Sequence, residues 1–218
     1  MQDRLSATGL LAAWEAGANR RPLDRALAIL WAAGAGGEDP AGLSLAERDR
    51  RLLALRRRCF GPVLHGRTSC PGCGAELETE IEADQLIDAL PVGTGETPRA
   101  LNSRDLAAVA DLPAERVASA LSARLAPGEE PSEALDRQVE AQASAVVLKT
   151  DLTCADCGTS WSEVLDVVDH VWASVEQAAT GLLREVAELA MRYGWSEAEI
   201  LALSPARRSA YLSLARQG

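Results

Sequence analysis

The chain has 218 residues, of which 47% are hydrophobic and 25% are charged, and its formal net charge is −10. This composition is typical of a globular protein that is long enough to bury a core, as one domain or as two small ones. The negative charge argues against binding to nucleic acid or to an anionic membrane, because both partners attract a positively charged surface.

The sequence shows no signal peptide, since residues 1–4 lead directly into an amphipathic segment. No apolar run approaches the ~18–20 residues of a membrane span. The chain has five cysteines, an odd number. Together these features predict a protein of the reducing cytoplasm, where Cys-x-x-Cys pairs are metal sites more often than disulfides.

Helical periodicity dominates the first part of the chain. Apolar side chains recur three and four residues apart over residues 10–14 and 23–31, which is the spacing of one helical face. Ser44 and Glu47 have the spacing of a capping box, in which the serine accepts a bond from an exposed amide and the glutamate reaches back. This box predicts a helix that runs to about Cys59 and ends at the Gly-Pro pair that follows.

Two short cysteine pairs are the most specific signal in the sequence. Each is a Cys-x-x-Cys followed by glycine, the pattern of a zinc knuckle, in which a tight turn points two thiolates at one metal. Since one knuckle supplies half of a tetrahedral site, we expect one structural Zn²⁺ to be bound by both. Four thiolate ligands leave no position for water, so such an ion stabilises structure and does not catalyse. The expected ligands are Cys70, Cys73, Cys154 and Cys157.

Sequence with a period of two flanks both cysteine pairs. Glutamates alternate with mostly apolar residues over residues 76–83, and residues 146–152 and 161–167 flank the second pair with strand-like sequence. Two hairpins with a knuckle at each tip form a zinc ribbon. We therefore expect an α+β fold, mainly α-helical, with a central four-stranded Cys₄ ribbon. Its halves are residues 67–92 and 146–167, split by a helical insertion over residues 93–145.

The cysteines and histidines also allow roles outside a shared zinc site. The two pairs could be unrelated structural or redox pairs, although a thioredoxin-type pair lies at a strand-to-helix junction and these pairs lie between strand-like segments. Cys59 fits a buried small hydrophobe on its helix. His65 and His170 are alternative ligands or hydrogen-bond partners of the site.

Helices flank the expected ribbon on both sides, over residues 1–66 and 168–218. An apolar stripe runs from Val168 to Tyr193 and ends at Gly194. A second capping box at residues 196–199 and a Ser-Pro pair at residues 204–205 then predict two short helices. The aromatic and basic residues of this capped unit are candidates for a partner-binding surface. They are Trp195, Arg207, Arg208 and Tyr211.

A run of arginines stands out in this acidic chain. It lacks the interleaved aromatic residues of a surface that binds single-stranded nucleic acid, so we interpret it as a solvated helix face that pairs with the acidic strand. A surface for an acidic protein partner is the alternative. The run comprises Arg48, Arg50, Arg51, Arg56, Arg57, Arg58 and Arg67.

The sequence contains none of the familiar catalytic patterns. It has no Gly-rich phosphate loop, no Ser/His/Asp set and only two histidines, neither of which is near a plausible nucleophile in sequence. We therefore do not expect an enzyme.

Several segments, taken in order, resemble one protein family. The most specific part is the tail from Tyr193 to Leu212, and the similarity spans nearly the whole chain except the insertion from about Gly93 to Ala145. The segments are Leu11-Ala-Ala-Trp14-Glu15, Arg25-Ala-Leu-Ala-Ile-Leu30, Asp49-Arg-Arg-Leu-Leu-Ala-Leu-Arg56 running into Phe60-Gly61, the two knuckles with Trp161, and Tyr193-Gly-Trp-Ser-Glu-Ala-Glu-Ile-Leu-Ala-Leu-Ser204 with Arg207-Arg208 and Tyr211-Leu212. Together they resemble the small baseplate hub assembly proteins of T-even-type phages, whose relatives are encoded in gene clusters of contractile injection systems.

The resemblance implies a non-enzymatic chaperone or scaffold that assembles the baseplate hub, with hub, tube or spike proteins as partners. The alternative is a zinc-ribbon module that binds nucleic acid or associates with transcription, in which the helix over residues 48–58 meets phosphates. A redox protein is a third possibility, and it predicts internal disulfides within the cysteine pairs.

Overall fold

The structure is a computed structural model that describes residues 4–34, 38–92 and 98–217. It confirms a mixed fold of helices and strands, and the first five residues of the expected insertion, 93–97, lie outside the described residues. The elements in chain order are α1 (Ala7–Gly17), α2 (Pro22–Ala32), the 3₁₀-helix η1 (Pro40–Gly42), α3 (Leu45–Phe60), β1 (Val63–Ser69), β2 (Glu76–Glu82), α4 (Ala83–Ala89), α5 (Ser103–Val109), α6 (Ala114–Leu125), α7 (Glu133–Ala145), β3 (Lys149–Thr153), β4 (Ser160–Val164), α8 (Val167–Tyr193), α9 (Glu197–Ala202) and α10 (Pro205–Ala215).

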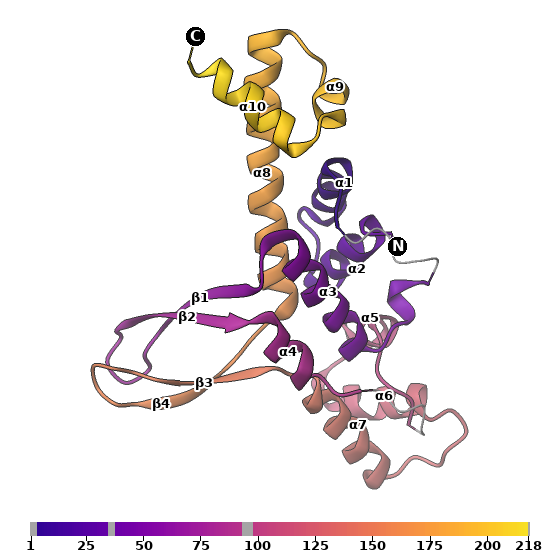
Figure 1. The fold of residues 1–218 in the computed structure, drawn as a ribbon. Coiled ribbons are helices and arrows are strands. Elements are labelled where there is room, and N and C mark those ends of the chain that lie inside the picture. Colours follow the sequence, from indigo (N-terminus) through magenta and orange to yellow (C-terminus); the bar gives the residue numbers. More distant parts are fainter. Residues whose placement is uncertain (1–3, 35–37, 93–97, 218) are drawn as a thin grey trace.

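The 27-residue helix α8 is the axis of the molecule. In Figure 1, helices α1–α3 lie beside its N-terminal half, α9 and α10 fold back on its C-terminal end, and the two hairpins project to one side. Asp166 caps the helix by accepting a bond from the Asp169 amide, and Gly194 ends it in the left-handed conformation at φ 69°. The predicted apolar stripe is confirmed, because its side chains fill the cores on which the other helices pack.

The main core joins the N-terminal helices, α4 and the N-terminal half of α8. Leu52 and Leu53 of α3 and Val171 and Val175 of α8 are fully buried in it. Side chains at the base of both hairpins belong to the same core, which anchors the hairpins in the body. These side chains are Leu64, Ile81, Leu148 and Leu165.

Trp172 is the largest aromatic anchor of this core, and it is 4% exposed. The guanidinium of Arg25 lies over its ring at 4.8 Å from the centroid. The backbone of Gly17 also approaches this ring so closely that an added Cβ would lie 2.3 Å from Trp172 Cζ3. Only glycine fits at the end of α1 against a ring that cannot move without disturbing the core.

Replacing Gly17 by alanine is therefore expected to destabilise the chain by about 1–3 kcal/mol, as overpacking does. Chemical denaturation of the variant measures this loss. The matched control is Gly181→Ala on α8, where an added Cβ meets nothing within 4 Å. Because alanine is the better helix former, the control should keep or slightly raise stability. Equal effects of the two substitutions would contradict the close approach to Trp172.

Two smaller cores adjoin the main one. The C-terminal end of α8 packs with α9 and α10 around Leu189 and Ile200, and Leu11 of α1 joins this cluster. Helices α5–α7 of the insertion enclose the other, around Leu125 and Val139.

The strands differ from the expected four-stranded ribbon. Within the described residues, β1 pairs only with β2 and β3 only with β4, both antiparallel, as two separate two-stranded sheets. The predicted central four-stranded ribbon is therefore not shown, and the structure has two separate two-stranded hairpins in its place. The physical reason is that the hairpins meet through their cysteine-bearing tips, and that such a junction requires no hydrogen bonds between strands.

The two predicted capping boxes both mark helix starts, with one correction to their bonding. Ser44 accepts a bond from the Glu47 amide, as predicted, but the Glu47 carboxylate pairs with Arg50 and Arg51 and does not reach back. The second predicted capping box is complete, with both reciprocal bonds present at residues 196–199. None of the helices in the described ranges is both long and apolar enough to cross a membrane.

Candidate metal centre

Each hairpin ends in a tight knuckle built by two backbone hydrogen bonds. In the first, the Cys70 amide donates to Ala75 O and the Gly74 amide donates to Cys70 O, both at 2.8 Å. Gly74 takes φ 77°, the left-handed conformation that this turn requires. The second knuckle repeats both bonds at 2.9 Å, with Gly158 at φ 73°. The two turns therefore have the same backbone design, and each points two sulfurs toward the other.

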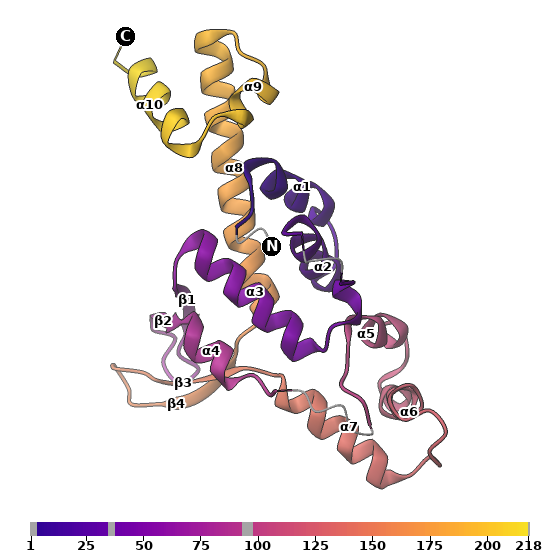
Figure 2. The same cartoon turned by 45° about the vertical axis from the view of Figure 1, so that its right-hand side comes forward.

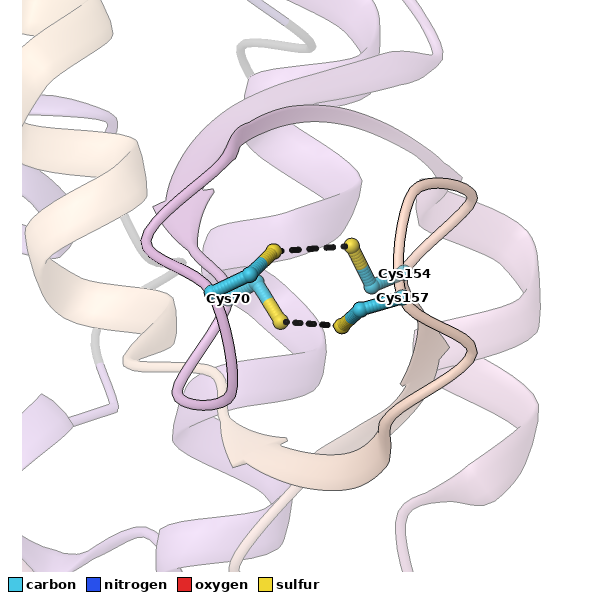
Figure 3. Close-up of side chains that lie close together, drawn as sticks. Cys70, Cys154 and Cys157 are labelled. Atoms are coloured by element: carbon cyan, nitrogen blue, oxygen red, sulfur yellow. Dashed lines mark hydrogen bonds between the residues drawn. The ribbon is translucent and has the colours of Figure 1, made fainter.

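The four predicted cysteines come together between the hairpin tips, as Figure 3 shows. Their sulfur atoms all lie within 4.8 Å of one another. Cys70 Sγ lies 3.6 Å from Cys157 Sγ, and Cys73 Sγ lies 3.7 Å from Cys154 Sγ, so each of these pairs joins opposite hairpins. The group, which we call the cysteine tetrad, can hold a metal ion. Such an ion would join segments that are 81 and 87 residues apart in the chain.

The backbone around the tetrad supports it. The Gly72 amide donates to Cys70 Sγ at 3.3 Å, a bond that orients the thiolate. An added Cβ on Gly72 would lie 2.4 Å from Thr159 Oγ1, so the two knuckles touch each other directly. Cys70 and Cys154 are buried, whereas Cys73 and Cys157 are exposed. One side of the tetrad is therefore open to solvent.

The thiols of the tetrad differ in acidity in the absence of metal. Bonds from the hydroxyl and then the amide of Thr159 lower the pKa of Cys157 to about 6. The Ala75 amide lowers the pKa of Cys73, but the neighbouring thiols of Cys157 and Cys154 outweigh it and raise that pKa to about 12. Because a metal ion has to displace the remaining protons, its binding should weaken as the pH falls. Thr159 was not predicted from the sequence as part of the site. Its position two residues after Cys157 is the feature of the sequence that could have indicated it.

The two histidines that were the alternative ligands, and the fifth cysteine, lie outside the tetrad. His65 is across the strands from Glu80, with Nδ1 3.5 Å from Oε1. His170 lines a small cleft between the hairpins, where burial first and the charge of Arg56 second lower its pKa. Cys59, interpreted as a buried small hydrophobe, is only half-buried; it packs against the main core and accepts a weak bond from the Leu5 amide at 3.4 Å.

The candidate partner surface near the C-terminus forms an aromatic cluster. Trp195 stacks on Tyr193 at 4.7 Å between ring centroids and meets Tyr211 edge-on at 4.9 Å. Arg208 is buried, pairs with Glu185 on α8 at 3.2 Å and donates to a backbone carbonyl of the α9–α10 connection. It therefore holds α10 on α8, while Arg207 is exposed.

The arginine run is engaged mainly within its own helix and its nearest neighbours. Arg48 is buried against Asp49, and Arg56 is buried and donates to Gly61 O. Among the arginines of this run, all of which lie in the described residues, only Arg67 forms an ion pair with the acidic strand, at 2.8 Å from Glu78. The prediction that the whole run pairs with that strand is therefore wrong. Most of these arginines instead pair with acidic residues near their own helix. Those pairs are Arg50–Glu47, Arg51–Glu47, Arg51–Glu38 and Arg57–Asp84.

No family model, no curated protein and no solved structure matches this chain. The assignment of the tetrad as a candidate metal centre therefore rests on its own geometry.

Proposed function

We propose that the chain is a non-enzymatic assembly chaperone or scaffold for the baseplate hub of a phage-tail-like contractile injection system, stabilised by a structural zinc ion. The observation that carries the proposal is the cysteine tetrad, whose four sulfurs come from two distant hairpins. A metal with four thiolate ligands has no free position for substrate or water. The sequence resemblance to baseplate hub assembly proteins is the reason for proposing this biological system. The four cysteines of the tetrad are the reason for proposing that the metal is structural and not catalytic.

The sulfur geometry fits zinc. In a tetrahedral site with Zn–S bonds of about 2.3 Å, neighbouring sulfurs lie about 3.8 Å apart. The two cross-hairpin distances in the tetrad are 3.6 and 3.7 Å, and every sulfur lies within 4.8 Å of the others. Iron also accepts four tetrahedral thiolates, so elemental analysis has to separate the two metals.

The shape of the molecule suits a scaffold. The hairpins leave the body near the N-terminal end of α8, and α9 and α10 lie at its other end, as both Figure 1 and Figure 2 show. At about 1.5 Å per residue, the 27 residues of α8 separate these two regions by about 40 Å. Two surfaces at this separation can contact different partners or distant parts of one partner.

The alternative function, binding to nucleic acid, loses its main support. Five of the six arginines over residues 48–58, which would meet phosphates, are buried or paired with acids of the same chain, and Arg58 is the exception. The hairpin beside them presents a face of glutamates at residues 76, 78, 80 and 82, which would repel phosphate.

A binding assay with the full-length chain tests the proposal against this alternative. The zinc-loaded protein is immobilised and exposed separately to purified hub, tube and spike proteins of its own gene cluster, and to duplex DNA over a salt series. Arg207→Glu should weaken capture of the cognate protein by about tenfold, as loss and reversal of one contact charge can do. Lys149→Glu, an equal charge change on exposed β3, should leave capture unchanged.

Both variants should melt at the wild-type temperature, since neither side chain is buried. If the folded, metal-loaded chain captures neither the hub, the tube nor the spike protein, the proposed function is contradicted. Binding to DNA that weakens steeply with salt would support the alternative.

A further inference from the structure

The distances across the tetrad point to a second way of joining the hairpins. We propose that the metal-free tetrad oxidises to two disulfides between the hairpins, Cys70–Cys157 and Cys73–Cys154, in place of disulfides within each Cys-x-x-Cys pair. The tips then stay joined when the metal is lost. The inference deepens the proposed role of the tetrad and rests on the same grouping of four sulfurs.

The nearest cross-hairpin sulfurs are in direct contact, with no other atom between them. Since a disulfide bond is about 2.05 Å long, Cys70 and Cys157 at 3.6 Å have to approach by only about 1.6 Å. The second pair starts at 3.7 Å. The close contact between Gly72 and Thr159 also places the two knuckles directly against each other at this point.

Each close pair consists of one exposed and one buried cysteine, and the two can take different parts in the oxidation. Cys157 is exposed and its neighbour Cys70 is buried, and Cys73 is exposed and its neighbour Cys154 is buried. A small disulfide in solution, such as oxidised glutathione, can therefore reach one sulfur of each pair. The buried sulfur of the pair lies in contact with it and can attack the mixed disulfide that forms there.

The chemistry balances with that small disulfide as the oxidant. The Cys157 thiolate attacks one sulfur of the oxidant, whose S–S bond breaks and releases one small thiolate. The Cys70 thiolate then attacks the Cys157 sulfur of the mixed disulfide and expels the second small thiolate. The two released thiolates take up the two protons that the cysteines lost. The second bond, Cys73–Cys154, forms by the same two exchange steps with a second molecule of oxidant, so each protein disulfide formed reduces one molecule of oxidant to two thiols.

Disulfides between the hairpins form readily only if the chain is folded when it is oxidised. Their partners are 87 and 81 residues apart, whereas the cysteines within a knuckle are three apart. Because closing a long loop costs more chain entropy than closing a short one, an unfolded chain favours the local pairs. Cross-hairpin disulfides as the main product would thus show that the tips remain together after the metal leaves.

A tryptic digest distinguishes the two connectivities directly. Trypsin places Cys70 and Cys73 on the peptide of residues 68–99, and Cys154 and Cys157 on the peptide of residues 150–184. The full-length chain is stripped of metal with a chelator under native conditions, oxidised with oxidised glutathione, alkylated and digested without reductant. The proposal expects one linked species in place of the two peptides, and a fall in free thiols from five to one, Cys59. Two separate peptides, each with an internal disulfide, would overturn it.

Double variants then identify the bonds. Cys70→Ser with Cys157→Ser leaves the cross pair Cys73–Cys154, while Cys70→Ser with Cys73→Ser leaves the knuckle pair Cys154–Cys157. The first should form its disulfide at least several-fold faster at equal oxidant, and the order should reverse in denaturant. A faster knuckle pair under native conditions would contradict the proposal. Metal content measured before chelation reports separately on the proposed zinc site, so failure of one inference is not failure of the other.

Discussion

Replacing Cys70 and Cys73 together by serine is expected to abolish metal binding and to lower the free energy of unfolding by about 4 kcal/mol. This is the stabilisation that a ligand present at about a thousand times its dissociation constant gives to the folded state alone. For a chain of this size, it corresponds to a fall of about 10 °C in the melting temperature. Differential scanning calorimetry of the purified variant, with its metal content measured on the same sample, checks both expectations.

The matched control is Cys59→Ser, which also replaces a cysteine but lies outside the tetrad. This variant should retain the metal and lose little stability, because Cys59 is only half-buried and makes one weak hydrogen bond. A double variant that melts at the wild-type temperature would show that the tetrad does not stabilise the fold.

The second large effect is expected at Asp105 in the insertion. Its carboxylate is fully buried and receives two bonds from Arg99, at 2.7 and 2.8 Å, and one from Arg124 at 3.1 Å. It also accepts a bond from the Asn102 amide, which completes a capping box on α5. One side chain thus ties the start of α5 to the end of α6.

Asp105→Ala should destabilise the chain by about 3 kcal/mol, because removing one partner of a buried ion pair leaves the others without their counter-charge. This loss is at the lower end of the usual range, since Arg99 and Arg124 are partly exposed and can regain water. The control is Asp111→Ala, which removes an exposed partner of Arg21 in the same insertion and should cost at most about 0.5 kcal/mol. Denaturant unfolding of the two variants measures the difference.

The difference in unfolding free energy between wild type and Asp105→Ala should depend on pH, and it should shrink in acid. Burial alone would raise the pKa of Asp105, but the bonds from Arg99 and the Asn102 amide outweigh it and lower the pKa. A carboxyl group with a lowered pKa stabilises the fold above its unfolded value of 3.8, and this stabilisation is lost as the pH falls further. The gap between wild type and Asp105→Ala should therefore narrow below about pH 4. A gap that stays constant into acid would mean that the charge of Asp105 is not what stabilises the insertion.

Local signals in the sequence predict much of this fold. The helix over residues 167–193 follows from its apolar stripe and its terminal glycine, and the starts of α9 and α10 follow from their capping serines. The knuckles also follow from local spacing, because two cysteines and a glycine define the turn completely. Each of these features depends on residues that are neighbours in the chain.

Features that depend on distant residues are not predicted. The short helix α4 continues directly from β2 without a capping side chain, so nothing in its sequence marks where it begins. The separation of the hairpins into two sheets depends on how their tips meet, which alternation within a strand does not encode. Arg208 looks like an exposed basic residue in the sequence, and only its packing against α8 shows that it is buried.

The arginine run illustrates the same limit. Its composition suggested one charged face, but Arg48 and Arg56 are buried while Arg57 is exposed and pairs with Asp84 of α4. Which partner each guanidinium takes depends on the positions of α4 and the insertion relative to α3. Composition alone therefore overstated how much free positive charge this helix carries.

Elemental analysis of the freshly purified full-length chain, combined with thermal melting before and after chelation, tests the central claim most directly. One zinc ion per chain is expected, with a melting temperature that falls on chelation under reducing conditions and recovers when zinc is added back. A chain without bound metal, or one whose melting temperature is the same with and without it, would contradict a stabilising ion between the two hairpin tips.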